Sequence, residues 1–113
     1  MELATTTEKH IKIVAVQDDR IDAAVAIEFK DAMRDSTQDG PNVVILDLSR
    51  VHFIDSSGLG AIVAAMKHMG KERKLALAGL TPTVERVFKL TRMDSVFSVF
   101  STLEGAVDEL AVQ

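Results

Sequence analysis

The sequence predicts an α/β fold in which one mixed central sheet carries helices packed mainly on one face. Strand-like and helix-like segments alternate from residue 11 to the end of the 113-residue chain, which is typical of strands joined by crossover helices. The two clearest strand candidates, residues 11–17 and 43–48, are apolar at odd and even positions, which favours places inside the sheet. We expect a single domain over residues 1–113, because a chain of this length builds one core.

The first predicted strand, residues 11–17, is rich in β-branched residues and ends at the charged turn of residues 18–20. Apolar residues with helical spacing follow, and Asp22 stands where a helix N-cap belongs. The breaker sequence Asp-Gly-Pro-Asn at residues 39–42 ends this predicted helix.

The middle of the chain predicts a central strand and a second helix. Residues 43–48 form the most strand-like stretch, and the helix follows the segment Val51–Ser57. Gly70 is a natural residue to end that helix, because glycine tolerates the left-handed backbone found there. The apolar side chains that share one face of the helix are Leu59, Ile62, Val63, Met66 and Met69.

The last third predicts two further strands and two further helices. Residues 75–78 and 96–100 are the strands, and Thr81-Pro82 provides a cap followed by proline at the first helical position. Ser101-Thr102-Leu103-Glu104 matches the S-x-x-E capping box, which predicts a final helix through Leu110.

Composition excludes several classes of function. The chain has no cysteine, and its three histidines are dispersed, so we expect neither disulfides nor a metal site nor a cofactor. A net charge of -4 without Trp or Tyr argues against nucleic-acid binding. The absence of a signal peptide and of a membrane-spanning apolar run leads us to expect a cytoplasmic protein that does not insert into the membrane.

The segment Ile54–Gly60 is the strongest candidate for function, because it joins the central strand region to the second helix. Its two serines lie at a helix N-terminus, where free amides and the helix dipole favour negative charge. Plain helix capping is the commoner role of such a sequence. The segment matches neither a phosphate-binding loop nor the G-x-S-x-G turn of serine hydrolases, and we therefore do not predict an enzyme.

Residues 53–60, Phe-Ile-Asp-Ser-Ser-Gly-Leu-Gly, resemble the signature of the STAS domain, in particular that of the bacterial anti-sigma factor antagonists. The resemblance covers nearly the whole chain, with further similarity at Ile21-Asp22 and at residues 82–91. It implies a mixed sheet with helices chiefly on one side. The chain differs from the family pattern at Asp19 and at Arg92-Met93, where the family commonly has Gly and Gly-Leu.

The resemblance also implies a phosphorylation switch. The unphosphorylated protein binds an anti-sigma factor that is a serine kinase and releases the sigma factor, and phosphorylation of Ser56 ends this binding. A PP2C-type phosphatase is a further expected partner, and we expect a monomer or a weak dimer. The residues implied in partner binding are Asp22, Asp55, Ser56, Ser57, Gly58, Leu59 and Gly60.

Several alternatives stay open at this point. The chain is also compatible with a STAS adaptor of a lipid-transport or membrane-transporter complex, with a nucleotide- or lipid-sensing module, and with Ser57 as the phosphoacceptor. A serine hydrolase ranks last. A cationic cluster at the end of the second helix is best interpreted as a solvated face that complements the helix dipole, in preference to an anion or partner site; its residues are Lys67, His68, Lys71, Arg73 and Lys74.

Overall fold

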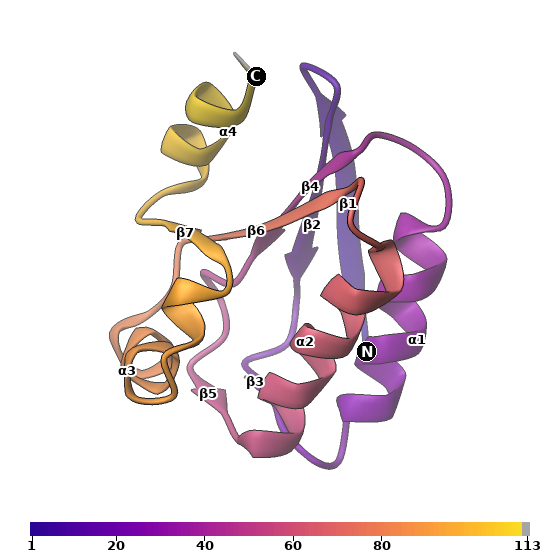
Figure 1. Cartoon of the computed structure of the whole chain (residues 1–113). Helices are drawn as coiled ribbons and strands as arrows, with labels where there is room; N and C mark the ends of the chain where they lie inside the picture. The colour runs from indigo at the N-terminus through magenta and orange to yellow at the C-terminus, as the bar shows by residue number, and fades with distance from the viewer. Residues whose placement is uncertain (112–113) are drawn as a thin grey trace.

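A five-stranded mixed sheet forms the centre of the protein in the computed structural model, which describes residues 1–111 (Figure 1). The strand order is β1-β2-β4-β6-β7; β1 is antiparallel to β2, and the other neighbours are parallel. The predicted mixed sheet and the central position of β4 are confirmed. The strands are β1 (Leu3–Glu8), β2 (Ile11–Val16), β4 (Val43–Asp47), β6 (Lys74–Ala78) and β7 (Ser98–Phe100).

Three of the four α-helices share one hydrophobic core on one side of the sheet. Helices α1 and α2 lie side by side there (Figure 1), and α3 joins the same core through Val84 and Phe88. Helix α4 packs on the opposite face, which confirms helices mainly on one side. The helices are α1 (Ala26–Thr37), α2 (Ser56–Met69), α3 (Pro82–Leu90) and α4 (Leu103–Ala111), with a 3-10 turn η1 at Met93–Ser95.

The edge strand β1 is absent from the sequence-based prediction. It pairs with β2 through a two-residue hairpin turn at Lys9 and His10, whose φ angles are 53° and 65°. Asn-Gly or Asp-Gly normally marks such a turn, because both central residues need positive φ. Most of β1 is also exposed, so neither a turn signal nor buried apolar residues identify it.

A second, two-stranded sheet lies beside the start of α2. It pairs β3 (Arg20–Ile21) with β5 (Phe53–Ile54) in parallel, with Arg20 opposite Phe53 and Ile21 opposite Ile54. Two residues are too few to show a period, so the sequence does not predict these two strands. This small sheet brings the segment before α1 next to the segment before α2.

The start of α1 corrects the predicted role of Asp22. The helix begins at Ala26 with Val25 as its N-cap, three residues after Asp22. One carboxylate oxygen of Asp22 accepts a hydrogen bond from the Ala24 amide at 3.1 Å. Asp22 therefore forms a local Asx turn ahead of the helix.

The caps of the later helices also differ from prediction. The hydroxyl oxygen of Thr102 accepts a hydrogen bond from the Gly105 amide at 3.0 Å, so the capping residue of α4 is Thr102 and the predicted box starting at Ser101 is wrong. Thr81 does precede α3 as its N-cap, but its hydroxyl donates to the carbonyl of Val51 at 2.7 Å. That bond ties α3 to the loop before β5.

Candidate functional site

The carboxyl ends of β3 and β5 place Asp22 and Asp55 beside each other. Each aspartate directly follows its strand, and the Asp55 amide donates to the Ile21 carbonyl at 3.4 Å. Because the two strands are parallel and in register, their carboxyl ends meet at the same edge. Two residues separated by 33 positions in the chain are thus brought to one corner of the molecule.

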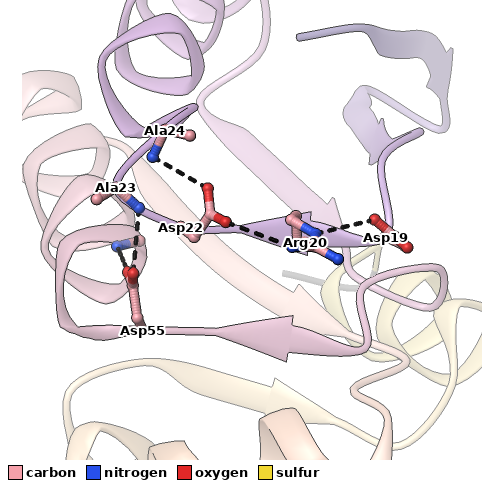
Figure 2. A network of polar contacts seen from close by, with 7 residues as sticks. Asp19, Arg20, Asp22, Ala23, Ala24 and Asp55 are labelled. Atoms are coloured by element: carbon pink, nitrogen blue, oxygen red, sulfur yellow. Dashed lines mark hydrogen bonds and ion pairs between the residues drawn. The ribbon is translucent and has the colours of Figure 1, made fainter.

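Asp55 joins the start of α2 to the loop before α1 (Figure 2). One carboxylate oxygen accepts a hydrogen bond from the Gly58 amide at 2.9 Å and caps α2. The other accepts from the Ala23 amide at 3.1 Å. Both carboxylate oxygens of Asp55 therefore accept hydrogen bonds from backbone amides. The side chain links the start of α2 to the loop before α1, and we call this arrangement the Asp55 clamp.

Asp22 is held in place by a neighbouring arginine as well as by the Asx turn (Figure 2). Its second carboxylate oxygen lies 3.8 Å from a guanidinium nitrogen of Arg20, and the same guanidinium lies 3.5 Å from the Asp19 carboxylate. The Asp22 side chain is 19% exposed. The carbonyl of Asp19 accepts a hydrogen bond from the His52 amide at 2.8 Å, which ties this turn to the segment before β5.

Ser56 and Ser57 are the first two residues of α2, and both are exposed. Because Asp55 supplies the cap, neither hydroxyl is used by the fold: no hydrogen bond within residues 1–111 involves either side chain. The backbone amides of both serines also have no protein acceptor in this part of the chain. The hydroxyl of Ser56 is thus accessible from solvent.

The glycines of the segment have two different roles. Gly58 is buried, and a Cβ built on it would lie 1.9 Å from the carbonyl oxygen of Ile21. Position 58 therefore has no room for a side chain. Because Gly58 is buried, it contributes to partner binding only indirectly, by letting α2 lie against Ile21. Gly60 is exposed with no atom within 4 Å of a built Cβ, and Leu59 is half-buried against the core.

Phe53 adds an apolar side chain next to the site, and the sequence analysis had not singled it out. The ring belongs to β5 and is 48% exposed. A large exposed aromatic residue beside polar groups is a typical anchor of protein interfaces. The alternation between exposed Phe53 and buried Ile54 extends over only two residues, which is too short to reveal which side faces out.

The described residues contain no cluster of three or more His, Asp or Glu side chains suited to a metal ion. Over the same residues, none of the helices has the length and apolar character needed to cross a membrane. The polar groups at the start of α2 are the Ser56 and Ser57 hydroxyls, the Asp22 and Asp55 carboxylates, and the backbone amides of the two serines.

Comparison with known proteins gives a consistent family. The profile of the STAS domain matches residues 2–106. The anti-sigma-F factor antagonist RsfB of Mycobacterium tuberculosis is 30% identical over 87 residues, which cover 77% of this chain and 71% of the relative. The anti-sigma-B factor antagonist of Staphylococcus aureus is 25% identical over 100 residues, covering 88% and 92% of the two chains.

Solved structures agree with this assignment. The crystal structure of an anti-sigma factor antagonist from Mycobacterium paratuberculosis superimposes with a TM-score of 0.86 at 27% identity, covering 96% of this chain and 92% of that one. The two curated relatives and the solved structure named above are anti-sigma factor antagonists, and the chain itself belongs to the STAS domain family.

Proposed function

We propose that this protein is an anti-sigma factor antagonist that is switched by phosphorylation of Ser56. In the unphosphorylated state, the surface around Ser56 binds an anti-sigma factor that is also a serine kinase, and the sigma factor is released. The observation that carries the proposal is the exposed Ser56 hydroxyl, which has no hydrogen bond in the described fold. The names of the relatives support the class of partner.

The partner surface combines rigid and accessible groups. The Asp55 clamp and the close contact of Gly58 with Ile21 hold the start of α2 relative to Asp22. Ser56, Ser57 and Gly60 are exposed on this rigid turn, and Phe53 offers an apolar anchor. Preorganisation of this kind lowers the entropy lost on binding.

Phosphorylation changes the charge of this surface while leaving the fold in place. The γ-phosphoryl group of ATP passes to the Ser56 oxygen, ADP leaves, and the hydroxyl proton goes to solvent. The phosphate adds about −1.5 to −2 charges next to Asp55. The helix N-terminus favours that charge within the fold, whereas desolvating it in an interface built for a neutral hydroxyl costs several kcal/mol.

A cost of ~3–4 kcal/mol weakens the complex several-hundred-fold, which suffices for a switch. A PP2C-type phosphatase then restores the binding-competent form by hydrolysing the phosphoserine. This cycle needs only an accessible side chain at position 56 and no rearrangement of the sheet.

The phosphoacceptor is identified by incubating the protein with ATP and an anti-sigma factor serine kinase from the same organism. Intact-mass spectrometry should show one added phosphate on the parent protein and on Ser57→Ala, and none on Ser56→Ala. Ser57→Ala is a matched control because it removes the same hydroxyl one residue further along the same helical turn. Full phosphorylation of Ser56→Ala would assign the site to another residue.

The electrostatic switch is tested with Ser56→Glu and the neutral Ser56→Gln, which have nearly the same shape. Calorimetry with the kinase should show Ser56→Glu binding at least tenfold more weakly than Ser56→Gln, with melting temperatures close to that of the parent. Equal affinities of the two variants would show that charge is not the reason for release.

A further inference from the structure

A groove with an apolar lining and a cationic rim lies at the C-terminal end of α2, at the opposite end of that helix from Ser56. It consists of two hollows of about 390 Å³ each, which share Met66, Lys71 and Arg73. Hollows of this size fall in the range of small-molecule sites. We call it the α2-end groove, and its remaining lining residues are Lys67, Gly70, Lys74, Leu75, Val96 and Ser98.

All the charged residues that line the α2-end groove are cationic, although exposed Glu72 lies between two of them in the chain. Lys67, Lys71, Arg73 and Lys74 line it, and no acidic residue does. The helix dipole places about half a negative charge at the end of α2, which offsets only a fraction of these four cations. An anion therefore meets a positive potential here although the chain as a whole has a net charge of -4.

Arg73 gives the α2-end groove a fixed wall. Two of its guanidinium nitrogens donate to backbone carbonyls, one to Thr37 at the end of α1 and the other to Pro41 at 2.8 Å. Its third donor, Nε, is buried and has no acceptor among the described residues. Because this nitrogen is buried, a ligand in the open groove does not reach it, and the contacts to a headgroup fall to Lys67, Lys71 and Lys74.

The apolar part of the lining indicates what else the ligand contains. Met66 contributes apolar surface, and Val96 is 47% exposed at the edge of the groove, whereas Leu75 belongs to the core beneath it. An inorganic anion leaves this surface in contact with water, whereas an alkyl chain covers it and gains about 0.8 kcal/mol per buried CH₂. The groove thus combines the two features that an amphipathic anion requires.

We propose that the α2-end groove binds an amphipathic anion, a molecule with one acyl chain and a carboxylate or phosphate headgroup. The three lysines hold the headgroup, and Met66 and Val96 contact the chain. The α2 helix is 14 residues long, so this site lies roughly 20 Å from Ser56 at 1.5 Å per residue. It is independent of the proposed phosphorylation switch.

The test titrates the ¹⁵N-labelled protein with oleate and with 1-oleoyl-glycerol-3-phosphate, both below their critical micelle concentrations. We expect saturable shifts of the amide signals of residues 66–75 and 96–98. Lys67→Glu combined with Lys71→Glu should weaken binding at least tenfold. The control, Arg86→Glu combined with Lys89→Glu, makes the same charge change on α3, outside the groove, and should leave affinity unchanged.

The apolar contribution is tested separately by Val96→Ser, which keeps every charge. This variant should bind both ligands several-fold more weakly, because its side chain no longer covers the acyl chain. Circular dichroism checks that each variant is folded. If the double variant does not fold, Val96→Ser still tests the proposal.

Four results would overturn the proposal. They are the absence of saturable binding, equal affinity for uncharged 1-oleoylglycerol, equal affinity for inorganic phosphate alone, and binding to anionic phospholipid vesicles without binding to the monomeric ligands. A preference for oleate or for the phosphate headgroup would support the site and identify which headgroup it takes.

Discussion

The first turn of α2 lies against β3 through a direct backbone contact between Gly58 and Ile21. A Cβ on Gly58 would lie 1.9 Å from the Ile21 carbonyl oxygen and 2.8 Å from its carbonyl carbon. Neither atom belongs to a flexible side chain, so the contact cannot relax by a change of rotamer. This contact sets the distance between Ser56 and Asp22, because each residue is within two positions of one of the contacting residues.

Gly58→Ala should therefore destabilise the protein by about 3 kcal/mol, the upper end of the usual cost of overpacking, although alanine favours the helix. The matched variant Gly60→Ala has open space around the new Cβ and should gain up to about 1 kcal/mol from helix propensity. Urea unfolding of both variants measures the difference. Equal stabilities of the two alanine variants would contradict the close contact.

Asp55→Ala should lower the free energy of unfolding by about 1–2 kcal/mol, because it removes the α2 cap and the tie to Ala23. Hydrogen exchange should become faster at the Gly58 and Ala23 amides together, since one carboxylate protects both. Asp31→Ala serves as the control, because it removes an exposed pair with Arg34 and should change stability by less than about 0.5 kcal/mol. Faster exchange at Gly58 alone would show that the tie to Ala23 is absent in solution.

Arg73→Met should destabilise the protein by about 3 kcal/mol. The substitution leaves the carbonyls of Thr37 and Pro41 without their charged donor, and hydrogen bonds to charged groups are worth about 1.5–3 kcal/mol each. Lys71→Met is the comparison, since Lys71 is exposed and should tolerate the change within about 0.5 kcal/mol. Thermal unfolding of the two variants distinguishes a structural arginine from a solvated one.

Arg92→Gly should stabilise the protein by up to about 1 kcal/mol. Arg92 adopts a left-handed conformation with φ at 61° between α3 and η1, and glycine takes that conformation without steric cost. Arg92→Ala keeps the unfavourable φ and should give no gain, which separates the backbone effect from loss of the arginine side chain. A chemical denaturation midpoint no higher for Arg92→Gly than for Arg92→Ala would contradict this account.

Arg92, one of the residues at which the chain differs from the family pattern, has a left-handed backbone in the structure. The resemblance to the family implies glycine at this position, and Arg92 has the left-handed backbone that glycine favours. The same holds at Lys9 and His10, where a two-residue turn is made without glycine or asparagine. Such positions escape pattern analysis because the surrounding hydrogen bonds, not the local residue, impose the backbone.

The sequence alone determined the helices and strands that have a clear periodic pattern of apolar residues. It also determined that residues 53–60 lie at the start of a helix. The strand predicted at residues 43–48 is the central strand β4 at Val43–Asp47, and α2 ends at Met69, directly before Gly70 as predicted. The signature segment 53–60 leads into the start of that helix. These features depend on hydrophobic periodicity and on local backbone preference, both of which act between residues close in the chain.

Only the tertiary structure decided which residues clamp the site and which remain accessible. Asp55 was recognised as part of the segment, but its bond to Ala23 crosses 32 residues, and the two carbonyls held by Arg73 lie 36 and 32 residues away. The sequence interpretation of Arg73 as part of a solvated cluster was wrong for this reason. Contacts of this range depend on how the sheet and helices pack, so the role of each polar side chain follows from its neighbours in space.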